Sequence, residues 1–224
     1  MARSLAIEGF IERLADVRFD NCFNPYADRC ATYDVEFAPE IRRENLYSIL
    51  KVLTSMSTVD LWVGRDLGYR GGRRTGIALT DERSLSLYAD HLGLSELHRA
   101  TIGEPVKERT AANIFRIISS VNVSILTWNV FPFHPFERGN SFSNRQHTKQ
   151  EAVTGFSFLE EIADIVNVRN IVAIGNDAAL WAERLGRTTH RVRHPSYGGQ
   201  TEFLEQMHGL YGISSLDQEQ LTLF

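Results

Sequence analysis

Apolar residues recur along this chain with two spacings, and stretches of the two kinds alternate. A spacing of three and four positions is typical of a helix with one buried face. The clearest example places Leu46, Ile49, Leu50 and Leu53 on one side of a predicted helix. The helical pattern is found over residues 1–17, 41–56, 81–92, 105–119, 148–166, 177–185 and 200–207.

Short apolar runs rich in β-branched residues lie between these helices and predict strands. Strands that alternate with helices favour a parallel sheet with helices on both faces. We therefore predict an α/β fold, a three-layer α/β/α sandwich with a central, mainly parallel four-stranded sheet. The four strands are expected over residues 59–63, 121–127, 170–174 and 189–193.

Local signals set several of the predicted boundaries. Thr80 and Asn176 are each expected to cap the helix that follows, because their side chains can accept a hydrogen bond from its first turn. Pro105 suits the first turn of another helix. The dipeptide Asn24-Pro25 predicts a turn.

The length of 224 residues is enough for one sizeable α/β domain. The sequence contains no internal repeat and no low-complexity tract. We predict a single domain over residues 1–224, with a helical N-terminal cover over 1–58 and a catalytic core over 59–208. The sequence leaves the role of the cover open.

The composition, with 43% hydrophobic and 23% charged residues, is that of an ordinary globular protein. The formal net charge of -4 argues against a generic nucleic-acid binder, which is often basic overall, but it leaves room for a local basic face. Cys22 and Cys30 are too few to supply the four thiolates of a typical zinc or iron–sulfur site. They favour free thiols in a cytoplasmic protein.

The sequence also favours a protein without membrane association. Residues 1–17 are interrupted by Glu8, Glu12 and Arg13, so they predict an amphipathic helix rather than a signal peptide. No apolar run approaches the length of a membrane span.

The richest candidate chemistry lies at the ends of the predicted strands. Residues 64–79 follow the first strand and contain five glycines, four arginines and one carboxylate, Asp66. Asn129 follows the second strand, and His194 follows the fourth. The carboxyl ends of parallel strands meet at one edge of a sheet, where α/β folds bind ligands. We therefore expect an acid, an amide and an imidazole to converge there.

This combination suits the cleavage of an N-glycosidic bond. The amide of Asn129 has one acceptor and two donors, and it can pair with the N–H and C=O edge that uracil presents. A neutral His194 can donate to an oxygen that becomes negative as the bond breaks. Asp66 can orient a water molecule or stabilise a cationic sugar.

Each residue by itself also fits a structural role. Asp66 suits a turn, Asn129 can satisfy loop backbone groups, and His194 can be a packed loop histidine. The arginines can form a solvated face, and aromatic residues are more often core than ligand contacts. His134 and His147 have no third partner at ligand spacing, so we expect no metal site.

At these residues the chain resembles the uracil-DNA glycosylase superfamily. Residues 64–79, GRDLGYRGGRRTGIAL, are similar, in register and without gaps, to the first motif of the single-strand-selective monofunctional uracil glycosylases. That motif has the form G-x-N-P-G, then six residues to T-G-V-P-F. Residues 129–132, NVFP, resemble the same family's N-Y-C-P segment, and residues 139–152 resemble the loop and helix that follow it. Residues 194–196 match the superfamily's H-P-S motif, and residues 170–186 fit the strand, turn and helix before it. The resemblance spans the predicted core, and three motifs in the right order are a stronger signal than any one alone.

Four positions depart from that pattern. Asp66 stands where the single-strand-selective family has Asn, and it matches the family-one motif G-Q-D-P-Y. Leu67 replaces the usual proline. Gly68 stands where family one uses a tyrosine to exclude the methyl group of thymine, and Leu79 stands where a phenylalanine stacks on the base. The resemblance thus implies a competent hydrolase with a less aromatic base pocket.

The resemblance implies a monofunctional uracil-DNA glycosylase, a hydrolase of base excision repair that flips uracil out of DNA and leaves an abasic site. It assigns catalysis to Asp66 and His194 without a cofactor. The expected partner is uracil-containing DNA, bound by a monomer. Tyr197 is expected to be the wedge that fills the gap left by the flipped base. The implied substrate-binding residues are Gly64, Gly68, Tyr69, Leu79, Asn129 and Phe131, and the implied DNA-binding residues are Arg70, Arg73, Arg74, Ser196 and Tyr197.

Three alternatives stay open on the sequence. The site can instead favour another deaminated base or a 5-substituted uracil, because Gly68 leaves room near C5 of the base. The chain can bind damaged DNA without turnover. An α/β hydrolase or a nucleotide-binding protein can share the same fold, since fold alone does not decide function. The preference for single or double strands is also open.

Overall fold

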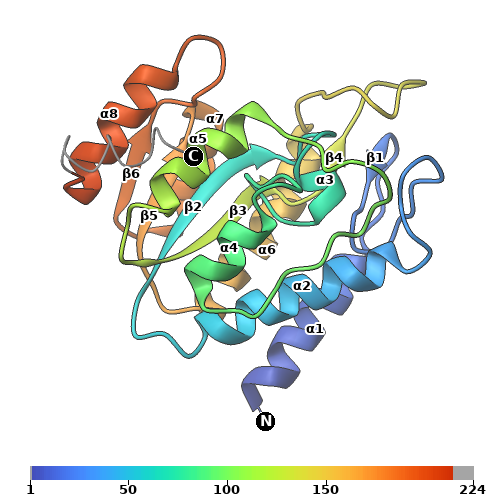
Figure 1. The fold of residues 1–224 in the computed structure, drawn as a ribbon, viewed down its shortest axis with the longest axis horizontal. Helices are drawn as coiled ribbons and strands as arrows, with labels where there is room; N and C mark the ends of the chain where they lie inside the picture. Colours follow the sequence, from blue (N-terminus) through green and yellow to red (C-terminus); the bar gives the residue numbers. More distant parts are fainter. Residues whose placement is uncertain (1, 214–224) are drawn as a thin grey trace.

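The computed structural model describes residues 2–213 and has a four-stranded sheet at its centre (Figure 1). The strand order is β3-β2-β5-β6, and each neighbouring pair in it is parallel. The predicted fold class is confirmed, because helices lie on both faces of this sheet. The strands are β2 (Val59–Asp66), β3 (Ser124–Phe131), β5 (Val168–Ile174) and β6 (Thr189–Val192).

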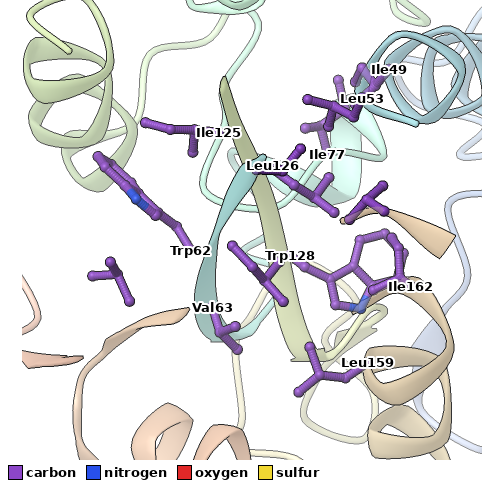
Figure 2. Close-up of a cluster of buried hydrophobic side chains, with 14 of the residues drawn as sticks. Ile49, Leu53, Trp62, Val63, Ile77, Ile125, Leu126, Trp128, Leu159 and Ile162 are labelled. Carbon is purple, nitrogen blue, oxygen red and sulfur yellow. The ribbon is translucent and has the colours of Figure 1, made fainter. Parts of the chain in front are cut away.

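Alternate side chains along the strands point into two separate apolar layers. Trp62 and Trp128 lie on opposite sides of β2 and β3 (Figure 2). Trp62 Nε1 donates to the Tyr211 hydroxyl at 2.7 Å, while Trp128 packs against Phe10 and Leu159 on the other side. Helices α4 and α5 cover the Trp62 side, and α6 and α7 cover the Trp128 side. Their bounds are α4 (Leu85–Leu92), α5 (Arg109–Ile118), α6 (Lys149–Ile165) and α7 (Asn176–Ala182), followed by the 3₁₀ turn η1 (Glu183–Leu185) and by α8 (Gln200–Tyr211).

The N-terminal segment forms two helices and a small second sheet. α1 (Ala2–Asp16) and α2 (Ala38–Leu53) lie beside the β3 edge of the central sheet (Figure 1). Between them, β1 (Cys22–Phe23) pairs antiparallel with β4 (His134–Pro135). The periodicity did not predict this pairing, because strands of two residues carry no period. It ties the N-terminal segment to the chain beyond β3.

The turn at Asn24-Pro25 is confirmed by its hydrogen bonds. The buried Asn24 side chain donates to Leu14 O at 2.8 Å and accepts from Tyr26 N at 3.0 Å. The same side chain therefore pairs a carbonyl at the end of α1 and an N–H group of the turn. Cys22 and Cys30 are free thiols, and burial raises the pKa of Cys22.

The prediction that Thr80 caps a helix is wrong. Its hydroxyl donates to Ala78 O at 3.0 Å, and α4 begins only at Leu85. Residues 81–84 form no helical turn. The Asp81 carboxylate accepts from Ser84 N at 2.9 Å and also from Glu108 N, which is distant in the sequence.

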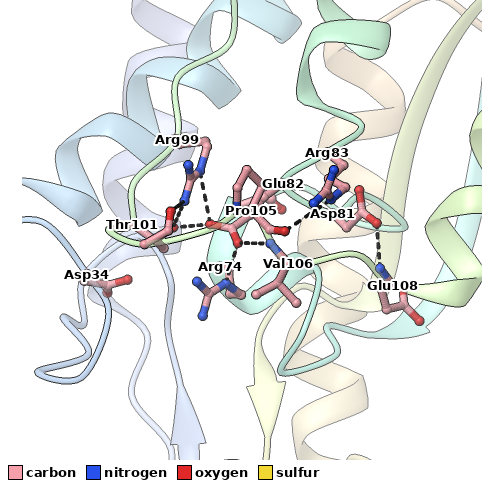
Figure 3. Close-up of polar contacts among 12 residues, drawn as sticks. Asp34, Arg74, Asp81, Glu82, Arg83, Arg99, Thr101, Pro105, Val106 and Glu108 are labelled. Atoms are coloured by element: carbon pink, nitrogen blue, oxygen red, sulfur yellow. Dashed lines mark hydrogen bonds and ion pairs between the residues drawn. The ribbon is translucent and has the colours of Figure 1, made fainter.

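Pro105 likewise does not start a helix. Its neighbour Val106 donates its N–H to Glu82 Oε2 at 2.8 Å, so this segment stays extended (Figure 3). Glu108 is the N-cap of α5, and its carboxylate accepts from Thr110 N and Ala111 N at 3.3 Å each. The buried carboxylates of Asp81 and Glu82 thus accept from the backbone of the segment before α5.

Asn176 is the first residue of α7, not its cap. The N-cap is Gly175, which has a φ of 92°. A Cβ at Gly175 would lie 3.3 Å from His194 Cβ, so both the conformation and the close approach require glycine.

Both central strands extend further than predicted at their carboxyl ends. β2 runs on to Asp66 and β3 to Phe131, and these two residues are paired across the sheet. Asp66 and Asn129 are therefore held by the sheet itself rather than by loops.

No helix in residues 2–213 is long and apolar enough to cross a membrane. The domain prediction over residues 1–224 includes Met1 and residues 214–224, which lie outside the described residues.

Candidate active site

A pocket of about 500 Å³ lies at the carboxyl edge of the sheet. The loops that follow β2, β5 and β6 form its walls, as the parallel topology predicts. It brings together six of the predicted site residues: the two catalytic ones, Asp66 and His194, with Gly68, Leu79, Ser196 and Tyr197. Asn129 is not among the residues that line it.

A second hollow, of about 700 Å³, lies at the opposite edge of the sheet. It is lined by residues 54–57 and 163–167, which precede β2 and β5. Arg187 on its wall is already paired with Asp164 at 2.5 Å. The carboxyl edge therefore carries the candidate site, although its pocket is smaller.

Asp66 is held between a guanidinium and an imidazole. Its Oδ2 accepts from Arg65 Nε at 2.6 Å, and its Oδ1 is in hydrogen-bond contact with His147 Nδ1. Arg65 also reaches Asp177 at 3.4 Å. The Asp66 carboxylate is only 5% exposed and lines the pocket, so two donors fix its orientation while one side faces the cavity.

His194 is a neutral hydrogen-bond donor at neutral pH. Burial, together with the charges of Arg65 and Arg193, lowers its pKa from 6.5 to about 4. Its Nδ1 accepts from Ser196 N at 3.1 Å. In a neutral imidazole that acceptor leaves the proton on Nε2, which is the atom that can donate to a ligand.

Asn129 is a buried amide with unused hydrogen-bonding atoms. It is 1% exposed, and neither Nδ2 nor Oδ1 has a hydrogen-bond partner among the described residues. Asn129 lies beside Gly64 and Leu79, because a Cβ added to Gly64 would collide with Asn129 Oδ1 and lie 2.9 Å from Leu79 Cδ2. An unpaired buried amide costs roughly 1–3 kcal/mol, which a bound ligand with a matching edge would offset.

Two residues at the pocket have left-handed backbones that are unusual for their types. Leu79 has a φ of 57° and Tyr197 has a φ of 53°. Each such conformation costs about 1–3 kcal/mol and is found most often at functional sites. The Tyr197 side chain is 99% exposed at the pocket mouth, which is the placement that a wedge requires.

The remaining predicted ligand contacts have different surroundings. Gly68 lines the pocket, with nothing within 4 Å of the point where a Cβ would lie. Tyr69 does not line it; its ring lies under the guanidinium of the exposed Arg70, 5.9 Å away. Phe131 is fully buried against the rings of Phe133 and His147, and it does not line the pocket.

The assignment of Arg73 and Arg74 to DNA phosphates does not fit the structure. Both are buried, with 3% and 8% exposure. Arg73 packs on the Phe23 ring at 4.2 Å, and Arg74 Nε donates to Glu82 at 2.8 Å. These contacts leave Arg70 as the exposed member of the three arginines.

The Arg74–Glu82 pair belongs to a buried network behind the pocket (Figure 3). Glu82 also accepts from the Thr101 hydroxyl and from Val106 N. Burial alone would raise the pKa of Glu82, but these hydrogen bonds and the Arg74 charge hold it below its usual value. The network fixes the end of the glycine-rich segment, where Leu79 sits.

The sequence reasoning missed three residues of the site in the segment before α6, two of which line the pocket. His147 contacts Asp66, while Asn144 and Arg145 line the pocket. Arg145 is itself held by Glu151 at 2.6 Å. The sequence suggests only metal binding for His147, and the likeness of residues 139–152 to a glycosylase loop is the signal that points to a role in the site. No group of three or more His, Cys, Asp or Glu side chains in residues 2–213 is placed to hold a metal ion.

His134 supports this segment as a neutral imidazole. Its Nε2 donates to Ser143 O at 2.8 Å and to Asn144 Oδ1 at 3.2 Å, and its Nδ1 accepts from Arg73 Nη1 at 3.2 Å. Burial and the Arg73 charge lower the pKa of His134 from 6.5 to about 4.

Lowering the pH from 6.5 to 5 is therefore expected to reduce the free energy of unfolding. In that window the unfolded chain protonates this histidine but the folded chain does not, so protons favour unfolding. At about 1.36 kcal/mol per pH unit, His134 accounts for about 2 kcal/mol. Urea unfolding at several pH values measures the slope. His134→Gln should reduce the slope, with the contribution of His194 remaining, and His98→Gln, a change at an exposed histidine, is the control. An unchanged slope in His134→Gln would contradict the assignment.

The arrangement of the sheet and its helices is consistent with the fold of the uracil-DNA glycosylase superfamily. The crystal structure of wild-type SMUG2 from Pedobacter heparinus, a member of that superfamily, is similar to this chain with a TM-score of 0.63. The match covers 92% of this chain and 95% of that one, at 12% sequence identity. No family model and no curated protein matches this sequence. The likeness is one of fold.

Proposed function

We propose that this chain is a monofunctional DNA glycosylase that flips uracil out of DNA and hydrolyses its N-glycosidic bond, as in base excision repair. The observation that carries the proposal is the unpaired amide of Asn129, which is buried near Leu79. Leu79 lines the pocket that also holds Asp66 and a neutral His194. The shared fold with SMUG2 supports the glycosylase class, and the amide supports the choice of base.

Base recognition falls to Asn129. Its Nδ2 donates to a carbonyl oxygen of uracil and its Oδ1 accepts from the ring N3–H, so both unused atoms gain partners. Cytosine presents an unprotonated N3 and an amino group on that edge, and it would leave the amide mispaired. The buried site therefore favours uracil over cytosine through the cost of unpaired groups.

Bond cleavage divides between the other two residues. The C1′–N1 bond breaks and its electron pair leaves with the base, whose O2 accepts a hydrogen bond from His194 Nε2. A water oxygen forms the new bond to C1′, and Asp66 takes the proton that this water loses. No lysine lines the described pocket, which supports hydrolysis over a Schiff-base route.

A single-lesion assay tests the proposal. The purified chain, without added metal, is incubated with a labelled oligonucleotide that carries one uracil, and abasic sites are then cleaved with alkali. Strand breaks in excess of enzyme, lost in His194→Ala, are expected. A gel shift without breaks would make the chain a damaged-DNA binding protein instead.

A second substrate class is favoured by the open space at Gly68. Because nothing lies within 4 Å of its missing Cβ, the pocket has no side chain there to exclude a substituent. Oligonucleotides with 5-substituted uracils, hypoxanthine or xanthine in place of uracil separate this reading from strict uracil specificity.

Tyr197→Ala is expected to slow base release from double-stranded DNA about tenfold more than from single-stranded DNA. Only a duplex leaves a stacked gap for the ring to fill. Rates on matched single- and double-stranded uracil substrates measure the difference. Leu180→Ala, which removes another exposed apolar side chain, is the control. Equal losses on both substrates would remove Tyr197 from the role of wedge.

A further inference from the structure

Arg73 is a buried cation that forms no ion pair with a carboxylate in the described chain. Aromatic rings surround it instead: its guanidinium carbon lies 4.2 Å from the Phe23 ring centroid, 5.2 Å from that of Phe142 and 6.0 Å from that of Tyr33. Its Nε is buried without a hydrogen-bond partner. Burying a charge without a counter-ion costs folding free energy. A function for Arg73 would explain why the protein keeps it there.

The contacts of Arg73 converge on one segment, residues 137–147, which we call the His147 loop. Arg73 Nη1 donates to Ser141 O and, at 3.2 Å, to His134 Nδ1. His134 in turn holds the loop through Ser143 O. The Phe142 ring on the guanidinium belongs to the same loop.

The far end of the His147 loop reaches the candidate catalytic carboxylate. Asn144 Oδ1 accepts from Tyr69 N at 3.0 Å, which joins the loop to the glycine-rich segment. His147 Nδ1 contacts Asp66 Oδ1. Arg73 itself does not line the pocket.

We propose that Arg73 is a positioning residue: it clamps the His147 loop between the glycine-rich segment and the N-terminal segment, so that His147 orients Asp66. The clamp assigns a role to the N-terminal segment, because Phe23 and Tyr33 supply two of its rings. Its consequence for turnover rests on the proposed glycosylase function, whereas its consequence for loop order does not.

Arg74 offers a matched control. It is also buried, also lies over an aromatic ring, Tyr33 at 3.9 Å, and is adjacent in sequence. Its polar side-chain partner is Glu82, however, and among the described residues no hydrogen bond or ion pair joins the Arg74 side chain to the His147 loop. Lysine at either position keeps the charge and removes the planar, forked guanidinium.

The first measurement is amide hydrogen exchange over residues 137–147 of the full chain. Arg73→Lys is expected to speed exchange there at least tenfold, and Arg74→Lys is expected to leave that segment unchanged. Phe142→Leu, a change at a 40% exposed side chain, should reproduce the effect if Arg73→Lys does not fold. Unchanged exchange in the folded Arg73 variant, or in Phe142→Leu, would overturn the clamp whatever the chain catalyses.

The second measurement is a double-mutant cycle on uracil release. Arg73→Lys is expected to lower kcat roughly 100-fold with KM nearly unchanged, since a small misplacement of a catalytic group has that effect. In a His147→Gln background the same change should cost less than about twofold, because its route to Asp66 is already lost. Equal losses in both backgrounds would overturn the role. An inactive wild-type chain would count against the proposed function, and the exchange result would still decide the clamp.

Discussion

Asp66→Asn is expected to reduce uracil release about 1000-fold while leaving affinity for uracil-containing DNA nearly unchanged. The amide has the size of the carboxylate and can still accept from Arg65 Nε, so the pocket keeps its shape. It cannot take the proton of the attacking water or stabilise a cationic sugar with a full charge. Single-turnover rates and binding to an uncleavable uracil analogue separate the two effects.

Asp177→Asn is the matched control for this experiment. Asp177 also binds Arg65, at 3.4 Å, but its side chain is 42% exposed at the pocket rim. Removing its charge should change the rate far less. Turnover that survives in Asp66→Asn would exclude Asp66 as the base. Similar losses of rate in both variants would show that Asp66 acts only by neutralising the charge of Arg65.

Asn129→Leu is expected to lower kcat/KM for uracil release about 100-fold and at the same time to stabilise the folded chain by about 1–2 kcal/mol. The lost activity follows from two missing hydrogen bonds to the base. The gain in stability follows from removing an amide that is buried without partners in the free protein. Kinetics and urea unfolding of the same preparation test both signs.

Asn45→Leu provides the contrasting case. Asn45 is also buried, but it donates to His98 O at 2.7 Å and accepts from His98 N at 2.9 Å. Its replacement should destabilise the fold by roughly 1–3 kcal/mol, because it leaves two backbone groups unpaired. A loss of stability in Asn129→Leu as large as that in Asn45→Leu would show that the Asn129 amide is satisfied in the free protein and would weaken its assignment to the base.

The central sheet and the helices on its two faces could be predicted, because both follow from the spacing of apolar residues that are close in the sequence. The run at Val59 is apolar except for the buried Asp60, and residues 171–174 are all apolar, which is typical of strands buried on both faces. The convergence of Asp66 and His194 followed from the rule that parallel strands end at one edge. The boundaries failed where side chains from another segment intervened, as with Asp81 and Glu108.

The surroundings of the arginines could not be predicted in the same way. A glycine-rich stretch with four arginines is typical of an exposed loop, yet Arg73 and Arg74 are buried. The rings that cover Arg73 come from Phe23 and Phe142, at opposite ends of the chain's first two thirds. His147 reaches Asp66 from 81 residues away, and no local pattern encodes that contact.

The sequence by itself determined the alternation of strands and helices, the parallel sheet and the edge at which an acid and an imidazole meet. These follow from periodicity and chain order, which are properties of neighbouring residues. Only the tertiary structure decided which polar groups are satisfied: it left the Asn129 amide unpaired, made His194 a neutral donor and enclosed Arg73 in aromatic rings. Those outcomes depend on burial and on partners far apart in the chain, because the energy of a polar group is set by what surrounds it rather than by what precedes it.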